Sequence, residues 1–418
     1  MEPAPTVGRA FSPLDEELAL QPGSLTPRQH EHLAHLATWM PFERAAQMME
    51  CLLGVQVSEA TTRRQTEQAG ALAQAVQTSQ AQTNTEDVQV ETAPARLVVS
   101  ADGAMVPLLG GEWAEVRTVA IGEVEKAGQA QGEDEVHVAR LSYFSRLSTA
   151  ETFADLAQVE MQRRGVSQAK QVCAVSDGAD WLQGFVDLHR PDALRILDFP
   201  HAAEHVSSLL QAVQQAGVSL PPDLLPRLLH RLKHRGPRLL MRLLQRLPDH
   251  LLQQEGIREH AGYVCKREAL MQYPSYREQG WPIGSGMVES ANKVVVEARL
   301  KGAGMHWERQ HINPMLTFRN AVCNERWSEV WHDVVTERAQ LRHKRRQQQA
   351  TEHWQQMMSS LLLLLLQFLP ATSAPVPSSP HPVVAAAPAA TLPGSSRPSA
   401  HHPWKRTPAC RTKVVAKI

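Results

Sequence analysis

Residues 96–103 read RLVVSADG, a short apolar run that closes on an aspartate and a glycine. Residues 171–178 repeat the pattern as QVCAVSDG. A short apolar run bounded by turn residues predicts a buried β-strand, and Asp-Gly predicts the turn that ends it. We therefore expect two buried strands, which deliver Asp102 and Asp177 at their carboxyl ends.

The segments around these two runs alternate between strand and helix patterns. Residues 115–123 (EVRTVAIGE) and 135–144 (EVHVARLSYF) alternate apolar and polar side chains, and residues 193–198 (ALRILD) form another apolar run. These patterns predict three further strands. Helices are expected over residues 148–164, which begin with a capping box, over residues 181–188, and from Pro200 onward. The order predicts a mixed α/β sheet with helices on its faces, as found in RNase-H-like nuclease cores.

Composition changes divide the rest of the chain. Residues 205–280 are rich in Leu, Arg and His, with prolines at helix breaks, which predicts an all-helical insertion with a basic face. Pro, Ala and Ser dominate the C-terminal end, which predicts disorder. The predicted parts are a disordered N-terminus (1–25), a helical DNA-binding region (26–70), a linker (71–94), the first part of the core (95–204), the insertion (205–280), the last part of the core (281–330), a helical extension (331–370) and a disordered tail (371–418).

The overall composition is that of a soluble protein. Apolar residues make up 43% and charged residues 21% of the 418 positions, which predicts a globular fold. The five cysteines are scattered and form no CxxC pair, which disfavours a zinc site or a disulfide framework and favours the cytoplasm. No signal peptide is expected at the N-terminus. The leucine run at residues 361–366 is much shorter than the ~20 residues of a membrane span, and we expect it to end a helix.

A third carboxylate comes from residues 281–301 (WPIGSGMVESANKVVVEARLK). A Gly-Ser-Gly turn precedes a helix that carries Glu289 in its first turn, with Lys293 on the same face. Phosphodiester chemistry uses clusters of carboxylates that hold two Mg²⁺ or Mn²⁺ ions. Each residue also has an ordinary interpretation: Asp-Gly is a common turn, Glu favours helix starts, and Glu with Lys at this spacing forms surface ion pairs.

Longer stretches resemble a known group of enzymes. ADGAMVPLLGGEWAEVRTVAIGEV, AVSDGADWLQ, LDFPHAAEHV and the segment from GWPIGSGMVES to AVCNERW are similar to DDE-type insertion-sequence transposases of the ISKra group, which are distantly Mutator-like. The resemblance covers roughly residues 30–330. By position it implies that Asp102, Asp177 and Glu289 are the catalytic metal ligands, with two Mg²⁺ or Mn²⁺ ions as cofactor.

The resemblance also implies accessory residues. Asp198 and His201 match a DxxH pattern in Mutator-related enzymes, where the histidine would contact the scissile phosphate or steady the metal ligands. A capping aspartate and a surface histidine are the equal alternative. Trp281 lies where related enzymes place an aromatic residue that could stack on an unpaired base, with core packing as the alternative.

Residues 41–70 have the pattern of a helix-turn-helix. A helix from about residue 42 to residue 53 ends at Gly54, and Ser58 can cap a second helix that would enter the major groove. Plain helical hairpins share this pattern. The predicted DNA contacts are Thr61, Thr62, Arg63, Arg64 and Gln65 on that helix, and Arg299 and Lys301 farther along the chain.

We therefore expect a transposase that cleaves double-stranded DNA at terminal inverted repeats and joins the released end to target DNA. The family implies a homodimer or larger assembly on DNA, in the bacterial cytoplasm. An RNase-H-like nuclease without strand joining and a decayed DNA-binding remnant remain alternatives. Neither membrane association nor a covalent protein–DNA intermediate is expected.

Overall fold

The structure, a computed structural model, describes residues 25–83, 92–125 and 136–367. The chain divides into two compact units, Met1–Ala350 and Thr351–Ile418. All the described elements belong to the first unit except the end of helix α16 (Trp327–Gln367), which continues into the second. The predicted N-terminal and C-terminal disordered segments lie mainly outside the described residues.

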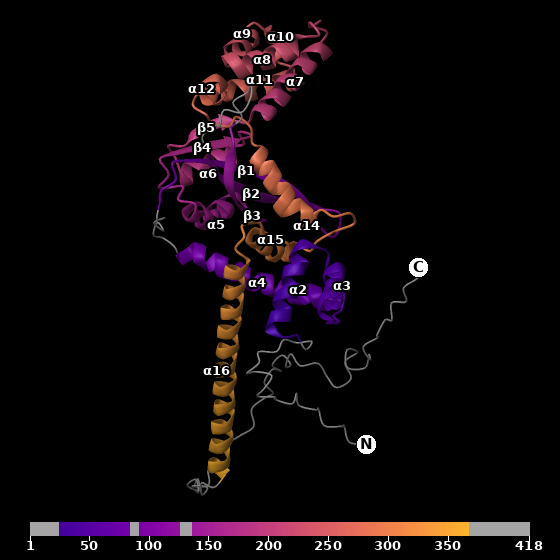
Figure 1. Cartoon of the computed structure of the whole chain (residues 1–418), viewed down its shortest axis with the longest axis vertical. Helices are drawn as coiled ribbons and strands as arrows, with labels where there is room; N and C mark the ends of the chain where they lie inside the picture. Colours follow the sequence, from indigo (N-terminus) through magenta and orange to yellow (C-terminus); the bar gives the residue numbers. More distant parts are fainter. Residues whose placement is uncertain (1–24, 84–91, 126–135, 368–418) are drawn as a thin grey trace, which may run out of the picture. The chain divides into compact units, whose positions relative to one another are not determined.

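One five-stranded mixed sheet organises the described part of the first unit (Figure 1). The order is β3-β2-β1-β4-β5, in which β1 pairs antiparallel with β2 and parallel with β4. β2 and β3 pair antiparallel, and β4 and β5 pair parallel. The strands are β1 (Arg96–Pro107), β2 (Trp113–Val124), β3 (Val138–Arg146), β4 (Gln171–Ser176) and β5 (Leu194–Leu197). The predicted five strands and their sequence order are confirmed.

β1 corrects one prediction, because it does not end at Asp102. Its pairing with β2 continues to Pro107, and Asp102 lies opposite Thr118 within the strand. Residues 104–106 keep the strand alternation, with Ala104 and Val106 buried and Met105 exposed. Asp-Gly is therefore no turn here, because the period-2 pattern continues beyond it.

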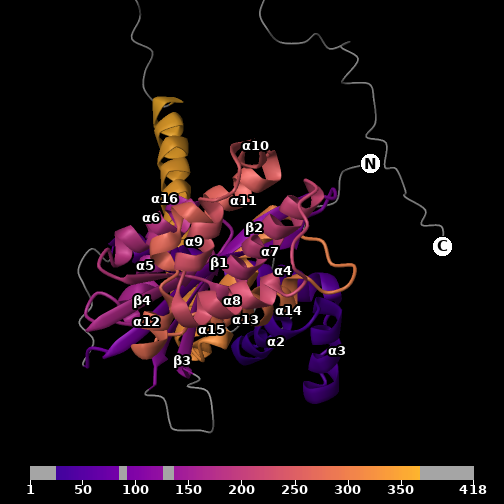
Figure 2. The same cartoon turned by 90° about the horizontal axis from the view of Figure 1, so that it is seen from above.

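Side chains on the two faces of the sheet pack into two separate hydrophobic cores. Leu97 and Val99 pack with Phe153 of α5 (Ala150–Arg163) and Leu182 of α6 (Asp180–His189), while Val98 faces the insertion on the other side. Full burial of such a side chain contributes about 1.5–3 kcal/mol. Seen from above, α8, α9 and α11 of the insertion project over the sheet (Figure 2).

All the regular elements between β5 and Trp281 are helices, as predicted. Its elements are α7 (Phe199–Gln215), α8 (Leu224–Arg235), α9 (Arg238–Leu244), α10 (Asp249–Leu252), α11 (Glu255–Lys266), the 3-10 turn η1 (Glu268–Leu270) and α12 (Tyr273–Glu278). After the insertion come α13 (Gly286–Ala291), the π-helical segment η2 (Asn292–Glu297), α14 (Ala298–Leu300) and α15 (Arg309–Cys323).

The N-terminal helices are α2 (Pro27–Trp39), α3 (Phe42–Leu53) and α4 (Glu59–Thr83). α4 corrects the predicted linker, since the helix continues thirteen residues past residue 70. It packs tightly on α15: a Cβ on Gly70 would lie 2.7 Å from the carbonyl oxygen of Pro314. Packing on the core thus extends a helix whose Gln- and Thr-rich sequence suggested a linker.

Three asparagines, two on α15 and one at its C-cap, pair with the backbone groups along the outer edge of β3 and the residue after it. Asn320 accepts from the backbone N–H of Ser145 at 3.0 Å and donates to its carbonyl at 3.1 Å. Asn324 and Asn313 make the same paired contacts with Tyr143 and with Leu147. An unpaired strand edge invites association with another chain, and here amide side chains cover it.

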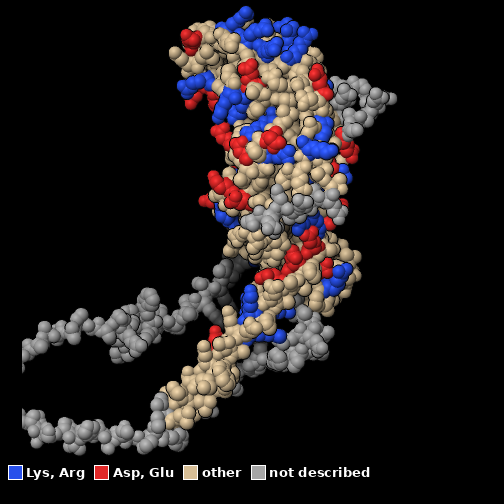
Figure 3. All heavy atoms as spheres, turned by 90° about the vertical axis from the view of Figure 1, so that its left-hand side faces the viewer, with Lys and Arg blue, Asp and Glu red and all other residues tan. Residues whose placement is uncertain are grey.

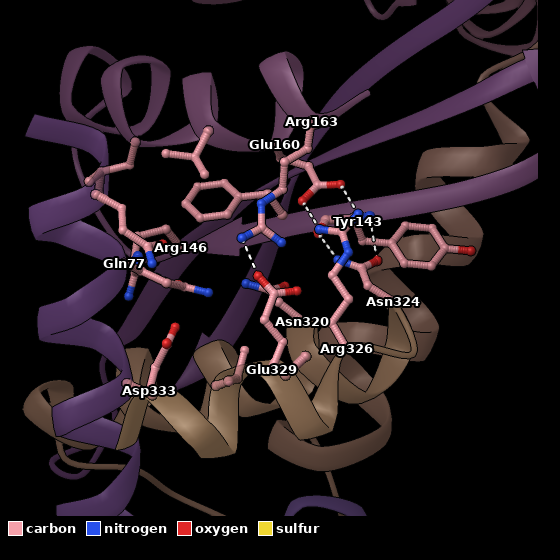
Figure 4. A pocket seen from close by; sticks show the side chains of 17 residues that line it. Gln77, Tyr143, Arg146, Glu160, Arg163, Asn320, Asn324, Arg326, Glu329 and Asp333 are labelled. Atoms are coloured by element: carbon pink, nitrogen blue, oxygen red, sulfur yellow. Dashed lines mark hydrogen bonds and ion pairs between the residues drawn. The ribbon is translucent and has the colours of Figure 1, made fainter. Parts of the chain in front are cut away.

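A small cavity of about 50 Å³ lies beside this edge (Figure 4). Two ion pairs line it, Arg326 with Glu160 and Arg163 with Glu329. Arg146 is buried there and donates to neutral oxygens of Thr317 and Gln77, and burial lowers its pKa to about 10. None of the predicted site residues lines this cavity.

Candidate active site

Asp102 and Asp177 come together because of the strand register. β1 and β4 pair in parallel up to Val99 and Ala174. Asp102 and Asp177 each lie three residues after this last pair, and the Asp177 carboxylate is near enough to raise the pKa of Asp102. The hydroxyl of Ser100 donates to the carbonyl of Val175 at 2.7 Å, which fixes the two strands just before the carboxylates.

Glu289 approaches from α13, on the far side of the insertion in sequence. The Ser285 hydroxyl lies 3.4 Å from a Glu289 carboxylate oxygen and can donate to it. One turn later, the amide of Asn292 donates to Asp102 Oδ2 at 3.0 Å. This contact connects the glutamate-bearing helix to β1.

The charges at this edge repel one another. Burial raises the pKa of Asp102, and the nearby carboxylates of Asp177 and Glu289 raise it further. The hydrogen bonds from the Gly103 N–H and from Asn292 act in the opposite direction. Within the described ranges, none of these three carboxylates forms an ion pair with Lys, Arg or His. The fold therefore brings these three carboxylates near one another with no described cationic side chain paired to them.

Asp198 forms a buried junction next to this group, with a side chain only 4% exposed. Its Oδ2 accepts from the His201 N–H at 3.2 Å as the N-cap of α7, and its Oδ1 accepts from the Ser285 N–H at 2.7 Å. Burial raises the pKa of Asp198, and Glu289 adds to the shift. Asp198 thus joins the start of α7 to the loop before α13, in agreement with the capping alternative; the His201 side chain is only half-buried.

Two insertion residues that the sequence did not indicate hold the backbone at Asp177. The Tyr263 hydroxyl donates to the Asp177 carbonyl, and Arg267 donates to the Gly178 carbonyl at 2.6 Å and 3.0 Å. The Arg267 guanidinium also lies 3.9 Å from the centre of the Tyr263 ring. Gly178 has φ +81°, a backbone conformation that favours glycine, and a Cβ there would also meet the Arg267 side chain. Burial raises the pKa of Tyr263 to about 12, which keeps the hydroxyl protonated as a donor.

A third unexpected residue, Arg319 of α15, holds the π-helical segment. It donates to the carbonyls of Val294 and Val295, and to that of Thr38 at 3.3 Å. A π-helical turn disturbs the regular i to i+4 bonding and leaves carbonyls that need other donors. Arg319 supplies them from the buried side and so steadies the turn that carries Asn292.

Trp281 and Lys293 are placed differently from each other. Trp281 is 3% exposed in the core between sheet and insertion, with the Arg96 guanidinium 3.9 Å from its ring centre. The structure therefore agrees with the core-packing alternative and not with an open stacking platform. Lys293 is exposed and forms no ion pair with Glu289 among the described contacts.

The predicted DNA contacts divide by burial. Thr61 is half-buried, and Arg63, Arg64 and Lys301 are exposed. The prediction is corrected for three residues, since Thr62, Gln65 and Arg299 are in the core. Arg299 is 2% exposed, donates to the Ala37 carbonyl at 2.9 Å and lies over the Phe42 and Trp307 rings. Phe42 and Ala37 lie more than 250 residues away in sequence, and Trp307 lies beyond the loop that follows, so local spacing did not indicate these contacts.

A cleft of about 380 Å³ separates the start of α4 from the loop after α14. Arg63 and Arg299 line it together with acidic groups. His311 lies 3.3 Å from both Glu67 and Glu308, and burial raises the pKa of Glu67. The mixture of charges distinguishes this cleft from a basic groove.

The residues at the acidic edge fit a hard divalent cation by their chemistry. In the described ranges, no three His, Cys, Asp or Glu side chains are arranged closely enough to hold a metal ion as they stand. The available donors are nevertheless all oxygens. Among the residues that the structure describes, the three carboxylates have no cationic partner, and Asn292 Oδ1 is buried without a hydrogen-bond partner. Oxygen donors of this kind suit Mg²⁺ or Mn²⁺. Asp102, Asp177 and Glu289 would hold the ions.

The chain belongs to an uncharacterised protein family (UPF0236), whose family model matches residues 14–332. The match includes the whole sheet, the insertion and the acidic edge, and it ends within the first turns of α16. No curated protein matches the chain. None of the helices in the described part of the chain combines the length and apolar content that a membrane span needs.

Proposed function

We propose that this protein is a DDE-type transposase of the ISKra kind, with an RNase-H-like core that cleaves and joins DNA. The observation that carries the proposal is the convergence of Asp102, Asp177 and Glu289, three carboxylates without a cationic partner in the described chain. The strand order β3-β2-β1-β4-β5, with a helical insertion between Asp177 and Glu289, supports the same proposal.

Each part of the chain has a role in this proposal. Asp102 and Asp177 present their carboxylates from adjacent strands, and Glu289 adds a third from α13. Asn292 orients Asp102 through its 3.0 Å hydrogen bond, while Tyr263 and Arg267 hold the backbone that carries Asp177. Bound Mg²⁺ ions would supply activation of the attacking oxygen and stabilisation of the leaving one.

DNA recognition is proposed for the surface of α3 and α4, which would act as a helix-turn-helix. Thr61, Arg63 and Arg64 remain available there. Arginine can read guanine edges or contact phosphate. By the same resemblance we propose action as a homodimer or larger assembly on terminal inverted repeats, in the cytoplasm.

Purified protein should nick a duplex that carries the terminal repeat of its own element when Mg²⁺ or Mn²⁺ is added, and it should join the new 3′ end to a target duplex. Asp102→Asn, Asp177→Asn and Glu289→Gln should each reduce both activities to background. Undiminished cleavage by Asp102→Asn would refute the proposal. Cleavage without any joining would identify a nuclease that shares the site.

A further inference from the structure

Two consecutive segments of the insertion, α8 and α9 with the turn that follows it, each carry a row of three exposed arginines. Arg227, Arg231 and Arg235 follow one another at four-residue spacing on α8. α9 and the turn after it repeat the arrangement with Arg238, Arg242 and Arg246. Residues four apart lie on one face of a helix, and eight residues of helix span about 12 Å. We call these six arginines the arginine rows.

The arginine rows are almost free of compensating charge. Residues 224–247 contain no Asp or Glu. In the described part of the chain, only Arg227 of the six forms an ion pair, with Asp223 at 3.3 Å, and both side chains are about 60% exposed. An exposed pair of this kind contributes little, about 0–1 kcal/mol. Figure 3 shows Lys and Arg gathered over this end of the molecule.

The apolar faces of the same helices are already used. Leu232 of α8 and Leu240, Met241 and Leu244 of α9 are buried in the core that the insertion shares with the sheet. No large exposed apolar side chain lies on α8 or α9. A basic helix that binds a membrane surface needs an apolar face to insert, so this surface can offer only charge and hydrogen bonds.

We propose that the arginine rows bind the phosphate backbone of duplex DNA, as a second DNA surface separate from α3 and α4. Two adjoining rows of guanidinium groups suit a partner with regularly repeated phosphates, because arginine contacts phosphate through paired donors. A contact of this kind positions DNA without reading its sequence. The inference rests on the proposed function for the identity of the polyanion, because the acidic edge needs DNA held in place beside it.

The test is DNA binding as a function of salt, without divalent metal, in an Asp102→Asn background so that no cleavage intervenes. Each phosphate contact contributes about 0.9 to the slope of log affinity against log salt. Changing either row to glutamine should therefore lower the slope by about 3 and weaken binding on the order of 100-fold at 0.1 M salt. The two rows together should have about twice the effect on the slope.

Two control proteins separate the effect of the positive charge from the effect of its position on the surface. Changing one row to lysine keeps its charge and should keep most of the slope. Neutralising Arg28, Arg140 and Lys170, three exposed cations elsewhere, removes as much charge and should change the slope much less. Circular dichroism and thermal unfolding verify that every variant is folded.

An unchanged slope in the folded double-row variant would overturn the inference, as would an equal loss in the remote control. Row-dependent binding to anionic phosphatidylserine vesicles, with no row-dependent binding to a 30-base-pair duplex, would also overturn it in favour of a membrane surface. The proposed function fails separately, through absence of metal-dependent cleavage by the unchanged protein. DNA binding that weakens when the arginine rows are changed, in a protein that shows no metal-dependent cleavage, would support the role of the arginine rows and refute the transposase proposal.

Discussion

Asn292→Ala tests whether the acidic edge depends on a residue that is not itself charged. The side chain is 6% exposed, and its amide donates to Asp102 Oδ2 at 3.0 Å. That hydrogen bond favours the ionised carboxylate and opposes the pKa rise that burial, Asp177 and Glu289 produce. Its removal should raise the pKa of Asp102 further.

The size of the effect follows from the type of contact. A hydrogen bond to a charged group contributes about 1.5–3 kcal/mol. Loss of that amount from the ionised form corresponds to an approximately 10- to 100-fold weaker hold on a divalent cation. A carboxylate must be deprotonated to bind metal, so affinity falls as the pH drops through the raised pKa of Asp102. In Asn292→Ala this fall should begin at higher pH than in the unchanged protein.

The assay is Mn²⁺ binding by calorimetry over a pH series that rises from the ordinary pKa of an aspartate, about 4, because the pKa of Asp102 is raised above it. Asn324→Ala is the matched control, because it also removes an asparagine with two hydrogen bonds, but to the backbone of Tyr143 and not to a carboxylate. It should lower the melting temperature and leave Mn²⁺ affinity unchanged. Identical Mn²⁺ affinity and pH dependence in Asn292→Ala and the unchanged protein would refute the role given to Asn292.

Three further predictions concern the stability of the fold. Asn320→Leu should lower the free energy of unfolding by about 2–4 kcal/mol in urea, because it leaves one backbone N–H and one carbonyl of β3 buried without partners; a loss below 1 kcal/mol would contradict the edge pairing. Burial lowers the pKa of His30 to about 4, which favours the neutral ring in the folded state. The folded protein should therefore keep its full stability above about pH 6.5, the pKa of an unperturbed histidine. As the pH falls from there toward 4, the free energy of unfolding should drop by about 3 kcal/mol. His30→Gln should remove that pH dependence, and equal acid sensitivity of both proteins would exclude this origin. Gly70→Ala should destabilise by about 1–3 kcal/mol because the new Cβ meets Pro314, whereas Gly262→Ala, in open space on α11, should stabilise by about 0.5–1 kcal/mol; the same sign for both would show that packing does not govern Gly70.

The strands could be predicted because their patterns are local. β4 covers Gln171–Ser176 and ends directly before Asp177, as its short apolar run predicted. β1 was predicted too short because Asp-Gly is a common turn, and only pairing with β2 shows that the strand continues. Propensity describes a residue and its neighbours, whereas a strand partner lies elsewhere in the chain.

Burial of polar side chains was harder to predict. Arg299 follows a helical segment and precedes a glycine-rich loop, a pattern typical of a surface cation. In the fold it meets Phe42 and Trp307, and its head donates to a backbone carbonyl of α2. Thr62 and Gln65 are buried for a similar reason, because helices on more than one side cover α4. The contacts that bury these residues span parts of the sequence that no periodicity connects.

The same distinction explains which residues of the candidate site the sequence could indicate. Few side chains can hold a hard cation, so Asp102, Asp177 and Glu289 could be proposed from their chemistry and from the resemblance of their segments. The groups that position them need only a hydrogen-bond donor. Tyr263, Arg267 and Arg319 all act on backbone carbonyls, which every residue has, and so leave no motif.

These donors also have a physical reason to come from distant elements. Three carboxylates that repel one another would separate if they were held only by their own strands and helix. α11 therefore fixes the backbone at Asp177, and α15 fixes the turn that carries Asn292. Both attachments are made by segments outside the sheet, so loss of Arg267 or Arg319 should loosen the acidic edge without altering a single carboxylate. The insertion is then part of the site's support as well as the bearer of the arginine rows.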